Sequence, residues 1–206
     1  MRRAPAILLA TLALAGCFGA SSVPPRQFYV LDAPGAVAPP RAVAPLGATL
    51  LVAGTTVDAF YDADSLVFSR AAGERQYYQF ASWTERPARR VALLAQQRID
   101  ARGSFAGVAG LASGVAGDLL LNVALVDFYH DVSVAPGLAR VAIAAELVDA
   151  RSRALLGRRV FAASASVPSD DARGAVAGFD RATADALAPL VVWVEATAAG
   201  AAKPAR

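Results

Sequence analysis

Three consecutive segments of alternating hydrophobicity in the second half of the chain most constrain its fold. The apolar positions on one face of the first two segments are Leu119, Leu121, Val123 and Leu125, then Val141, Ile143, Ala145 and Leu147. A third segment spans residues 155–166. Alternation with a period of two is typical of β-strands with one buried face. The connections, at about residues 131–137 and 149–153, are short enough for antiparallel neighbours. These segments therefore predict an antiparallel meander.

Two amphipathic helices are predicted to cover this sheet. Ser82 to Arg86 offer capping side chains before Pro87, and the apolar residues Val91, Leu94, Ala95 and Ile99 then recur at helical spacing to about Ala101. A terminal helix follows Ser169-Asp170, with an apolar stripe of Val176, Phe179, Leu187, Leu190 and Val194. Pro189 is expected to kink or divide it. The predicted fold class is α+β, with a mainly antiparallel sheet packed against two amphipathic helices.

Shorter segments complete the predicted sheet. Residues 27–31 and 49–53 have the β-branched and aromatic composition of strands, and residues 66–70 and 76–80 are spaced as a β-hairpin. Residues 33–47 are rich in Pro, Ala and Gly, which favours a surface connection. Residues 104–108 are expected to form a short strand before a glycine-rich stretch that ends at Gly117.

The N-terminus has the features of a lipoprotein leader. Met1-Arg2-Arg3 is basic, residues 6–15 are apolar, and Leu14-Ala15-Gly16-Cys17 matches a lipobox. We expect cleavage between Gly16 and Cys17 and attachment of lipid, including palmitate, to Cys17, rather than an ordinary secretory leader or a buried thiol. Cys17 is the only cysteine, so an internal disulfide and a thiolate metal site are excluded. The expected organisation is a signal peptide at 1–16, a tether at 17–26, a single domain at 27–198 and a disordered tail at 199–206.

Charge gives no indication of nucleic-acid binding. Removal of Arg2 and Arg3 with the leader lowers the formal net charge from +3 to +1, and no basic stripe with interleaved aromatic residues is present. The densest basic pairs are Arg89-Arg90 and Arg158-Arg159. We interpret them as solvated surface, with contact to lipid headgroups or to an acidic partner as the alternative.

No residue set in the sequence is typical of catalysis or of metal binding. His130 lies beside Asp131 and near Ser133, but adjacent side chains on a strand point to opposite faces, so a turn or edge histidine is favoured. Asp58, Asp62 and Asp64 lack the spacing and the following Glu of a calcium loop. We expect no catalytic residue, no metal and no cofactor other than the lipid on Cys17. We therefore predict that the protein is not an enzyme.

Two clusters are candidates for contact with a partner or a lipid. Tyr77, Tyr78, Phe80 and Trp83 are close together in sequence, which favours a core or hairpin–helix junction and, as the alternative, a partner interface. The glycines at 107, 110, 114 and 117 are not followed by the Gly-Lys-Ser/Thr of a phosphate loop, so a flexible loop is expected. Val108, Leu111 and Val115 would give this loop an apolar surface for a partner or a lipid tail.

The order of these motifs resembles that of the ABC-type transport auxiliary lipoproteins, a family that includes the lipoprotein of the paraquat-inducible lipid-transport operon. The resemblance rests on the lipobox, residues 28–31, residues 66–70, and residues 77–80 leading into Trp83-Thr84-Glu85-Arg86-Pro87 and a helix. The glycine-rich insertion before Asp118 departs from the family pattern.

This resemblance implies a non-enzymatic part of an envelope lipid-transport system. Its implied partners are an ABC permease, an ATPase and a mammalian-cell-entry domain protein. The expected cargo is phospholipid or another hydrophobic molecule, and a homo-oligomer is an open possibility. The alternative function is an outer-membrane assembly lipoprotein that binds a β-barrel. Phe18 and Gly19 follow Cys17 without an Asp at the next position. We therefore expect a lipid anchor in the cell envelope, facing the periplasm, with the outer membrane favoured over the inner membrane.

Overall fold

The computed structural model describes residues 24–35, 45–56 and 59–202. Gly16, Cys17 and the predicted signal peptide lie outside these residues, as do Asp58 and most of the predicted connection at 33–47. In chain order the elements are β1 (Gln27–Tyr29), β2 (Leu46–Thr56), the 3-10 turn η2 (Ala59–Tyr61), β3 (Ser65–Ser69), β4 (Gln76–Trp83), α2 (Pro87–Arg102), β5 (Phe105–Gly110), the 3-10 turn η3 (Leu111–Ser113), β6 (Leu119–Asp131), β7 (Leu138–Asp149), β8 (Leu155–Ser166) and α3 (Ala172–Ala201).

The predicted meander is confirmed by β6, β7 and β8, which pair antiparallel in sequence order. Leu121 lies opposite Leu147 and Val123 opposite Ala145, and all four side chains are buried. A bulge between Leu125 and Asp127 shifts the register, so Phe128 and His130 take the buried positions beyond it. The period-two pattern therefore identified the buried face correctly.

The complete sheet is mixed, with strand order β1-β4-β3-β6-β2-β5 and with β7 and β8 beyond β6. The longest pairings are antiparallel, but β2 runs parallel to both β5 and β6, as β3 does to β6 and β1 to β4. The sequence did not predict these parallel pairings, because they join strands that are distant in the chain. β2 also begins at Leu46, inside the predicted connection, where Leu46 N–H donates to the carbonyl of Ser104.

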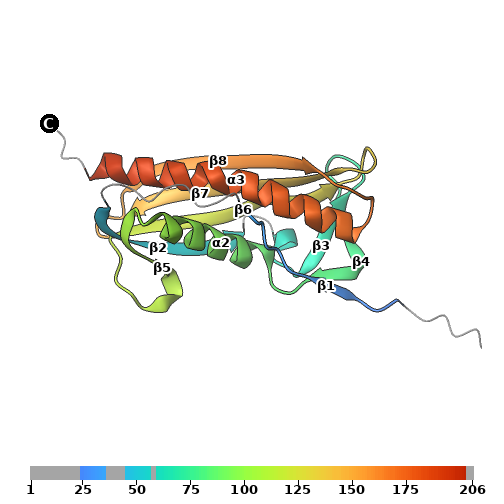
Figure 1. Ribbon diagram of the computed structural model, residues 1–206, viewed down its shortest axis with the longest axis horizontal. Helices are drawn as coiled ribbons and strands as arrows, with labels where there is room; N and C mark the ends of the chain where they lie inside the picture. The colour runs from blue at the N-terminus through green and yellow to red at the C-terminus, as the bar shows by residue number, and fades with distance from the viewer. Residues whose placement is uncertain (1–23, 36–44, 57–58, 203–206) are drawn as a thin grey trace, which may run out of the picture.

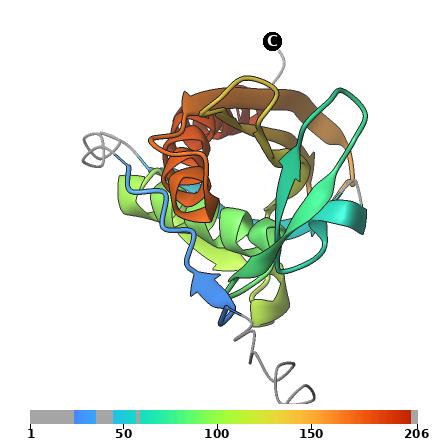
Figure 2. The ribbon, with the colours of Figure 1, turned by 90° about the vertical axis from the view of Figure 1, so that its right-hand side faces the viewer.

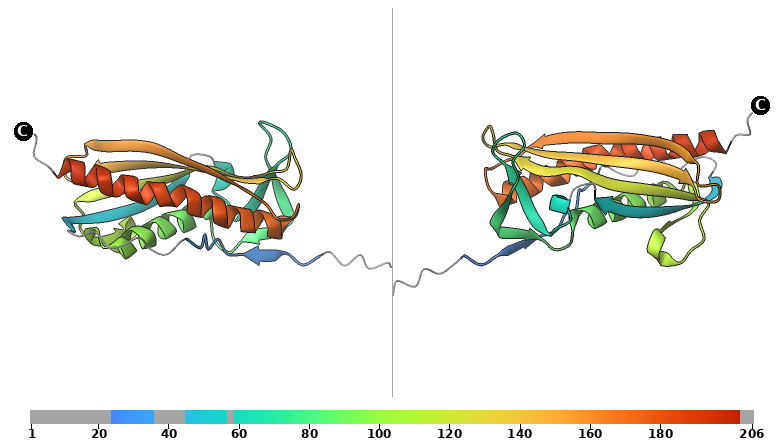
Figure 3. Two further views of the ribbon diagram at one scale, coloured as in Figure 1. Left: turned by 45° about the horizontal axis from the view of Figure 1, so that its top comes forward. Right: turned by 180° about the vertical axis from the view of Figure 1, so that it is seen from behind.

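Both helices lie on the same side of the sheet, which confirms the α+β class (Figure 1). Seen along the long axis, the sheet curls and α2 and α3 occupy its open side (Figure 2). Core aromatic rings join the layers, since Trp83 of β4 and Phe128 of β6 both contact Phe179 of α3, at ring-centroid distances of 5.6 Å and 4.3 Å. β1 and the C-terminal end of α3 lie at opposite ends of the molecule (Figure 3).

The helix ends differ from the sequence-based expectation. Pro87 opens α2 as predicted. The N-cap is Arg86, whose guanidinium has no acceptor and makes no capping bond. Ser82, one of the predicted capping residues, is buried in β4. The N-cap of α3 is Asp171, whose carboxylate accepts from Gly174 N–H at 2.7 Å. The predicted capping residues, Ser169-Asp170, directly precede it.

α3 is one continuous helix, so Pro189 does not divide it. Pro189 is exposed, and the carbonyl of Asp185 that it leaves without an N–H partner is therefore on the side of the helix that faces water. The helix also extends to Ala201, beyond the predicted start of a tail at 199. By length and composition alone α3 is apolar enough to cross a membrane, but its buried stripe packs on the sheet as in a core helix.

Candidate functional site

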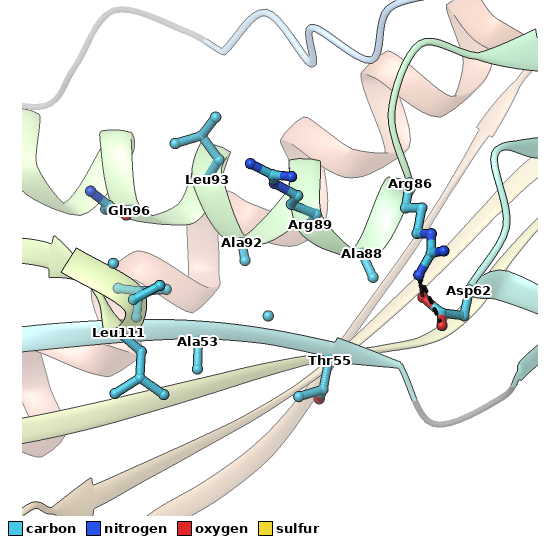
Figure 4. A pocket seen from close by; sticks show the side chains of 14 residues that line it. Ala53, Thr55, Asp62, Arg86, Ala88, Arg89, Ala92, Leu93, Gln96 and Leu111 are labelled. Atoms are coloured by element: carbon cyan, nitrogen blue, oxygen red, sulfur yellow. Dashed lines mark hydrogen bonds and ion pairs between the residues drawn. The ribbon is translucent and has the colours of Figure 1, made fainter. Parts of the chain in front are cut away.

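A groove of about 890 Å³ lies between α2 and the edge of β2 (Figure 4). β5 pairs with β2 only as far as Val52, opposite Gly110, where the chain turns away into η3. β6 continues beside β2 to Thr56. Among the described residues, positions 53–56 of β2 therefore have a neighbouring strand on one side only.

Small residues form the inner wall of this groove, and larger apolar residues lie at its rim. Ala88 and Ala92 point from α2 toward β2 (Figure 4). The approach is close at Gly54, where an added Cβ would lie 2.7 Å from Ala92 Cβ and 3.1 Å from the carbonyl oxygen of Ala88. Leu93 and Leu111 are 36% and 51% exposed, so the groove offers apolar contacts that no described segment uses fully.

One end of the groove is charged. Arg86 lies 3.3 Å from both carboxylate oxygens of Asp62, which closes that end with an exposed ion pair. The Arg89 side chain is 85% exposed, and its Nε lies 3.9 Å from Glu85. Two guanidinium groups and one carboxylate line the groove, so it carries an excess of positive charge.

The chemistry of this lining is suited to binding. Among the described residues that line it, the uncharged polar side chains are Thr55 and Gln96, and none of these lining residues is a histidine. A nucleophile activated by a general base is therefore not assembled there. In the described part of the chain, no three His, Cys, Asp or Glu side chains come together as a metal site.

The predicted aromatic cluster is divided between core and surface. Trp83 is 2% exposed in the core, so it is not available as a contact residue. Tyr78 is half-buried, and its hydroxyl lies 2.8 Å from His130 Nδ1. Tyr77 is 42% exposed and stacks on Phe60 at a centroid distance of 4.3 Å. Of the three predicted contact residues in this cluster, only Tyr77 presents a large exposed surface.

His130 is not the turn or edge residue that the sequence predicted, because it is fully buried in β6 between β3 and β7. Its Nε2 lies 3.0 Å from the carbonyl oxygen of Pro136, which can only accept, so Nε2 donates and Nδ1 accepts from Tyr78. Burial lowers the pKa of the imidazole and raises that of the Tyr78 phenol to about 12. Both groups are therefore neutral near pH 7 and hydrogen-bonded inside the sheet, as is typical of buried polar side chains that stabilise a fold.

Asp131, the neighbour of His130, takes no part in that arrangement. Its carboxylate accepts from the Ser133 hydroxyl at 2.6 Å and from Arg140 Nε at 2.8 Å, and these bonds lower its pKa to about 2. Asp131 and Ser133 therefore bond to each other and not to the imidazole. This agrees with the sequence-based expectation, because His130 and Asp131 are adjacent on a strand and their side chains point to opposite faces.

The first part of the predicted glycine-rich loop belongs to strand β5, which ends at Gly110. Val108 lies in β5 and packs partly against the core, whereas Leu111 and Val115 follow it and are 51% and 49% exposed. Leu111 lines the groove and Val115 does not. The remaining groove residues, such as Ala53, Gly54, Ala88 and Ala92, were not among the predicted site residues. Small apolar side chains carry no functional signal in a sequence, and only their placement beside this edge of β2 makes them part of a candidate site.

The fold is a mixed sheet with two helices on one side, and the groove lies between α2 and an edge of β2. The chain belongs to the family of ABC-type transport auxiliary lipoprotein components, whose sequence pattern it matches over residues 29–190. The match includes every described helix and strand from β2 to β8, together with most of α3.

Solved structures share this fold. The crystal structure of XCC0632 from Xanthomonas campestris, a DUF330 protein, is 21% identical with a TM-score of 0.74, and the match covers 85% of this chain and 98% of that one. A second crystal structure, of an uncharacterized protein, is 12% identical with a TM-score of 0.64, covering 83% and 99% of the two chains. No curated protein sequence matches the chain.

Proposed function

We propose that the protein is a non-enzymatic auxiliary lipoprotein of an ABC-type envelope system that transports phospholipid or a similar lipid. In this proposal its partners are a permease, an ATPase and a mammalian-cell-entry domain protein. The lipid on Cys17 holds the chain at the periplasmic face of the outer membrane. The observation that carries the proposal is the family match over residues 29–190.

The position of the domain relative to Cys17 supports a short tether. β1 begins at Gln27, ten residues after the cysteine, and a fully extended link of that length spans at most about 35 Å. Since β1 lies at one end of the elongated molecule (Figure 3), the tether would leave the groove and the far end of α3 free for protein partners.

The lipid anchor is tested with a Cys17→Ser variant and an alkyne-labelled palmitate. We expect label on the wild-type chain and none on the variant, with the wild type in the outer-membrane fraction and the variant released to the soluble fraction. Recovery of the wild type wholly in the inner membrane would contradict the proposed location, and unlabelled wild type would contradict the anchor.

The partners are tested by affinity purification of the tagged, acylated chain from cross-linked cells. A permease, an ATPase and a mammalian-cell-entry protein are expected together, with phospholipid in the complex by mass spectrometry. Co-purification with a β-barrel assembly machine in place of the transporter would support the alternative function and reject transport.

A further inference from the structure

We infer that the groove between α2 and β2 binds an extended, acidic segment of a partner protein, which adds to the open edge of β2 as a short strand. The partner is taken to be a component of the assembly proposed above, so the inference rests on that function in this respect.

The backbone of β2 provides the first argument. Thr49 N–H donates to the Asp118 carboxylate at 2.8 Å, and Thr49 C=O accepts from Asp118 N–H at 2.9 Å, so both backbone groups of Thr49 face β6. Backbone groups alternate along a strand, which directs those of Ala53 and Thr55 to β6 and those of Gly54 to the opposite side. β5 has already ended there, opposite Val52. The N–H and C=O of Gly54 thus face the groove, and an extended backbone is a natural partner for them.

The length of the open edge limits the size of the bound segment. β2 extends four residues beyond its last pairing with β5, from Ala53 to Thr56. At about 3.3 Å per residue this edge is about 13 Å long. It accommodates four or five residues of a strand that continues the line of β5, from which η3 turns away.

The side chains of the groove define the sequence that fits. In a strand added here, alternate side chains face α2, where Ala88, Ala92 and the rim residue Leu93 favour small or branched apolar residues. Arg89 is largely exposed and its nearest carboxylate is 3.9 Å away, so a carboxylate from the partner would give it a closer ion pair. The fitting segment therefore presents both apolar and acidic residues at its α2-facing positions, which lie two residues apart along the strand.

Binding is tested with the full-length acylated chain in detergent and a ten-residue valine–glutamate peptide, in which valine and glutamate take turns at every second position and threonine stands between them. We expect hydrogen exchange at residues 53–56 to slow in the presence of the peptide. A valine–lysine peptide should bind at least tenfold more weakly, and N-methylation of every second amide on one edge of the valine–glutamate peptide should abolish binding.

Variants of the groove separate its charged and apolar contributions. Arg89→Glu should reverse the preference between the two peptides, and the double variant Leu93→Gln, Leu111→Gln should weaken binding of the glutamate peptide at least fivefold. The matched controls are Arg151→Glu and Val134→Gln, at exposed positions outside the groove lining, and they should bind like the wild type. Circular dichroism checks that each variant is folded.

Several results would overturn the inference. The first is that amide hydrogen exchange at residues 53–56 stays unchanged when the peptide is bound. The second is that the N-methylated peptide binds as tightly as the unmodified one. The third is that lysophosphatidylglycerol, and not the peptide, slows amide exchange at this edge. Protection that rises with protein concentration alone would assign the edge to a second copy of this chain and would equally reject the acidic segment.

A photo-cross-linker at Leu93 in cells distinguishes this inference from the proposed function. We expect it to cross-link an acidic, extended segment of a transporter component, identified by mass spectrometry. If the transporter co-purifies but cross-links elsewhere, the groove assignment fails while the transport function stands. If the peptide binds but no transporter is recovered, the proposed function fails while strand addition stands.

Discussion

At the scale of single residues, His130 makes stability depend on pH. Burial lowers the pKa of its imidazole in the folded chain below the ordinary value of 6.5, so protonation favours the unfolded chain. The stability that neutral His130 provides is complete above about pH 6.5 and decreases as the pH falls below it. The stability that the ionised Asp131 carboxylate provides is complete above about pH 4 and is lost only as the pH falls toward its folded pKa of about 2.

We therefore expect the free energy of unfolding in urea to be lower at pH 5.0 than at pH 7.5, and to change less over this interval in His130→Gln. An identical pH dependence in the variant and the wild type would show that His130 is not responsible.

Trp83 and Tyr77 differ in burial although they lie on the same strand. Trp83→Ala removes a ring that packs against Phe128 and Phe179, so it should lower the free energy of unfolding by about 3–5 kcal/mol. Tyr77→Ala removes one stacked pair with Phe60 at the surface, with an expected loss of about 1 kcal/mol. Urea unfolding monitored by circular dichroism measures both, and equal losses would contradict this division between core and surface.

At the scale of the elements, the start of α3 depends on Asp171. Asp171→Ala removes the acceptor for Gly174 N–H, and loss of such a cap costs about 1 kcal/mol. Asp170→Ala is the control, because Asp170 is exposed and does not cap the helix, and its expected effect is within about 0.5 kcal/mol. Thermal unfolding compares the two, and a larger effect at Asp170 would restore the sequence-based assignment.

The packing of α2 on β2 depends on Gly54. Gly54→Ala places a methyl group 2.7 Å from Ala92 Cβ and 3.1 Å from a backbone carbonyl, and overpacking of this kind costs about 1–3 kcal/mol. Gly47 lies on the same strand with open space around it, so Gly47→Ala should change stability by less than about 0.5 kcal/mol. Denaturant unfolding of both variants measures the contrast, and a neutral Gly54→Ala would show that α2 can move away from β2.

At the scale of the whole molecule, the shared core predicts cooperative unfolding. Trp83 links β4 and β6 to α3, while Trp193 of α3 contacts Phe161 of β8 at a centroid distance of 5.7 Å. Tryptophan fluorescence therefore reports on both halves of the sheet, and its transition should coincide with that of far-UV circular dichroism. Two separated transitions would contradict the prediction of one domain.

The candidate site was less predictable than the fold. Leu111 was predicted as a contact residue and does line the groove. It could be predicted because a leucine within a glycine-rich segment stands out in the sequence. Trp83 was proposed as an alternative contact and is buried, since a sequence does not show which aromatic residues face the core. The groove itself depends on the ends of β2 and β5, which local patterns define poorly.

The sequence alone determined the meander of β6, β7 and β8, the β3–β4 hairpin, the two helices and hence the α+β class. Hydrophobic periodicity and short connections are local properties, and the burial of one face selects the register. Only the tertiary structure decided that β2 lies in parallel between β5 and β6, that His130 is buried and that, within the described ranges, residues 53–56 have a neighbouring strand on one side only. Each of these depends on contacts between segments distant in the chain, which the pattern within any one segment does not encode.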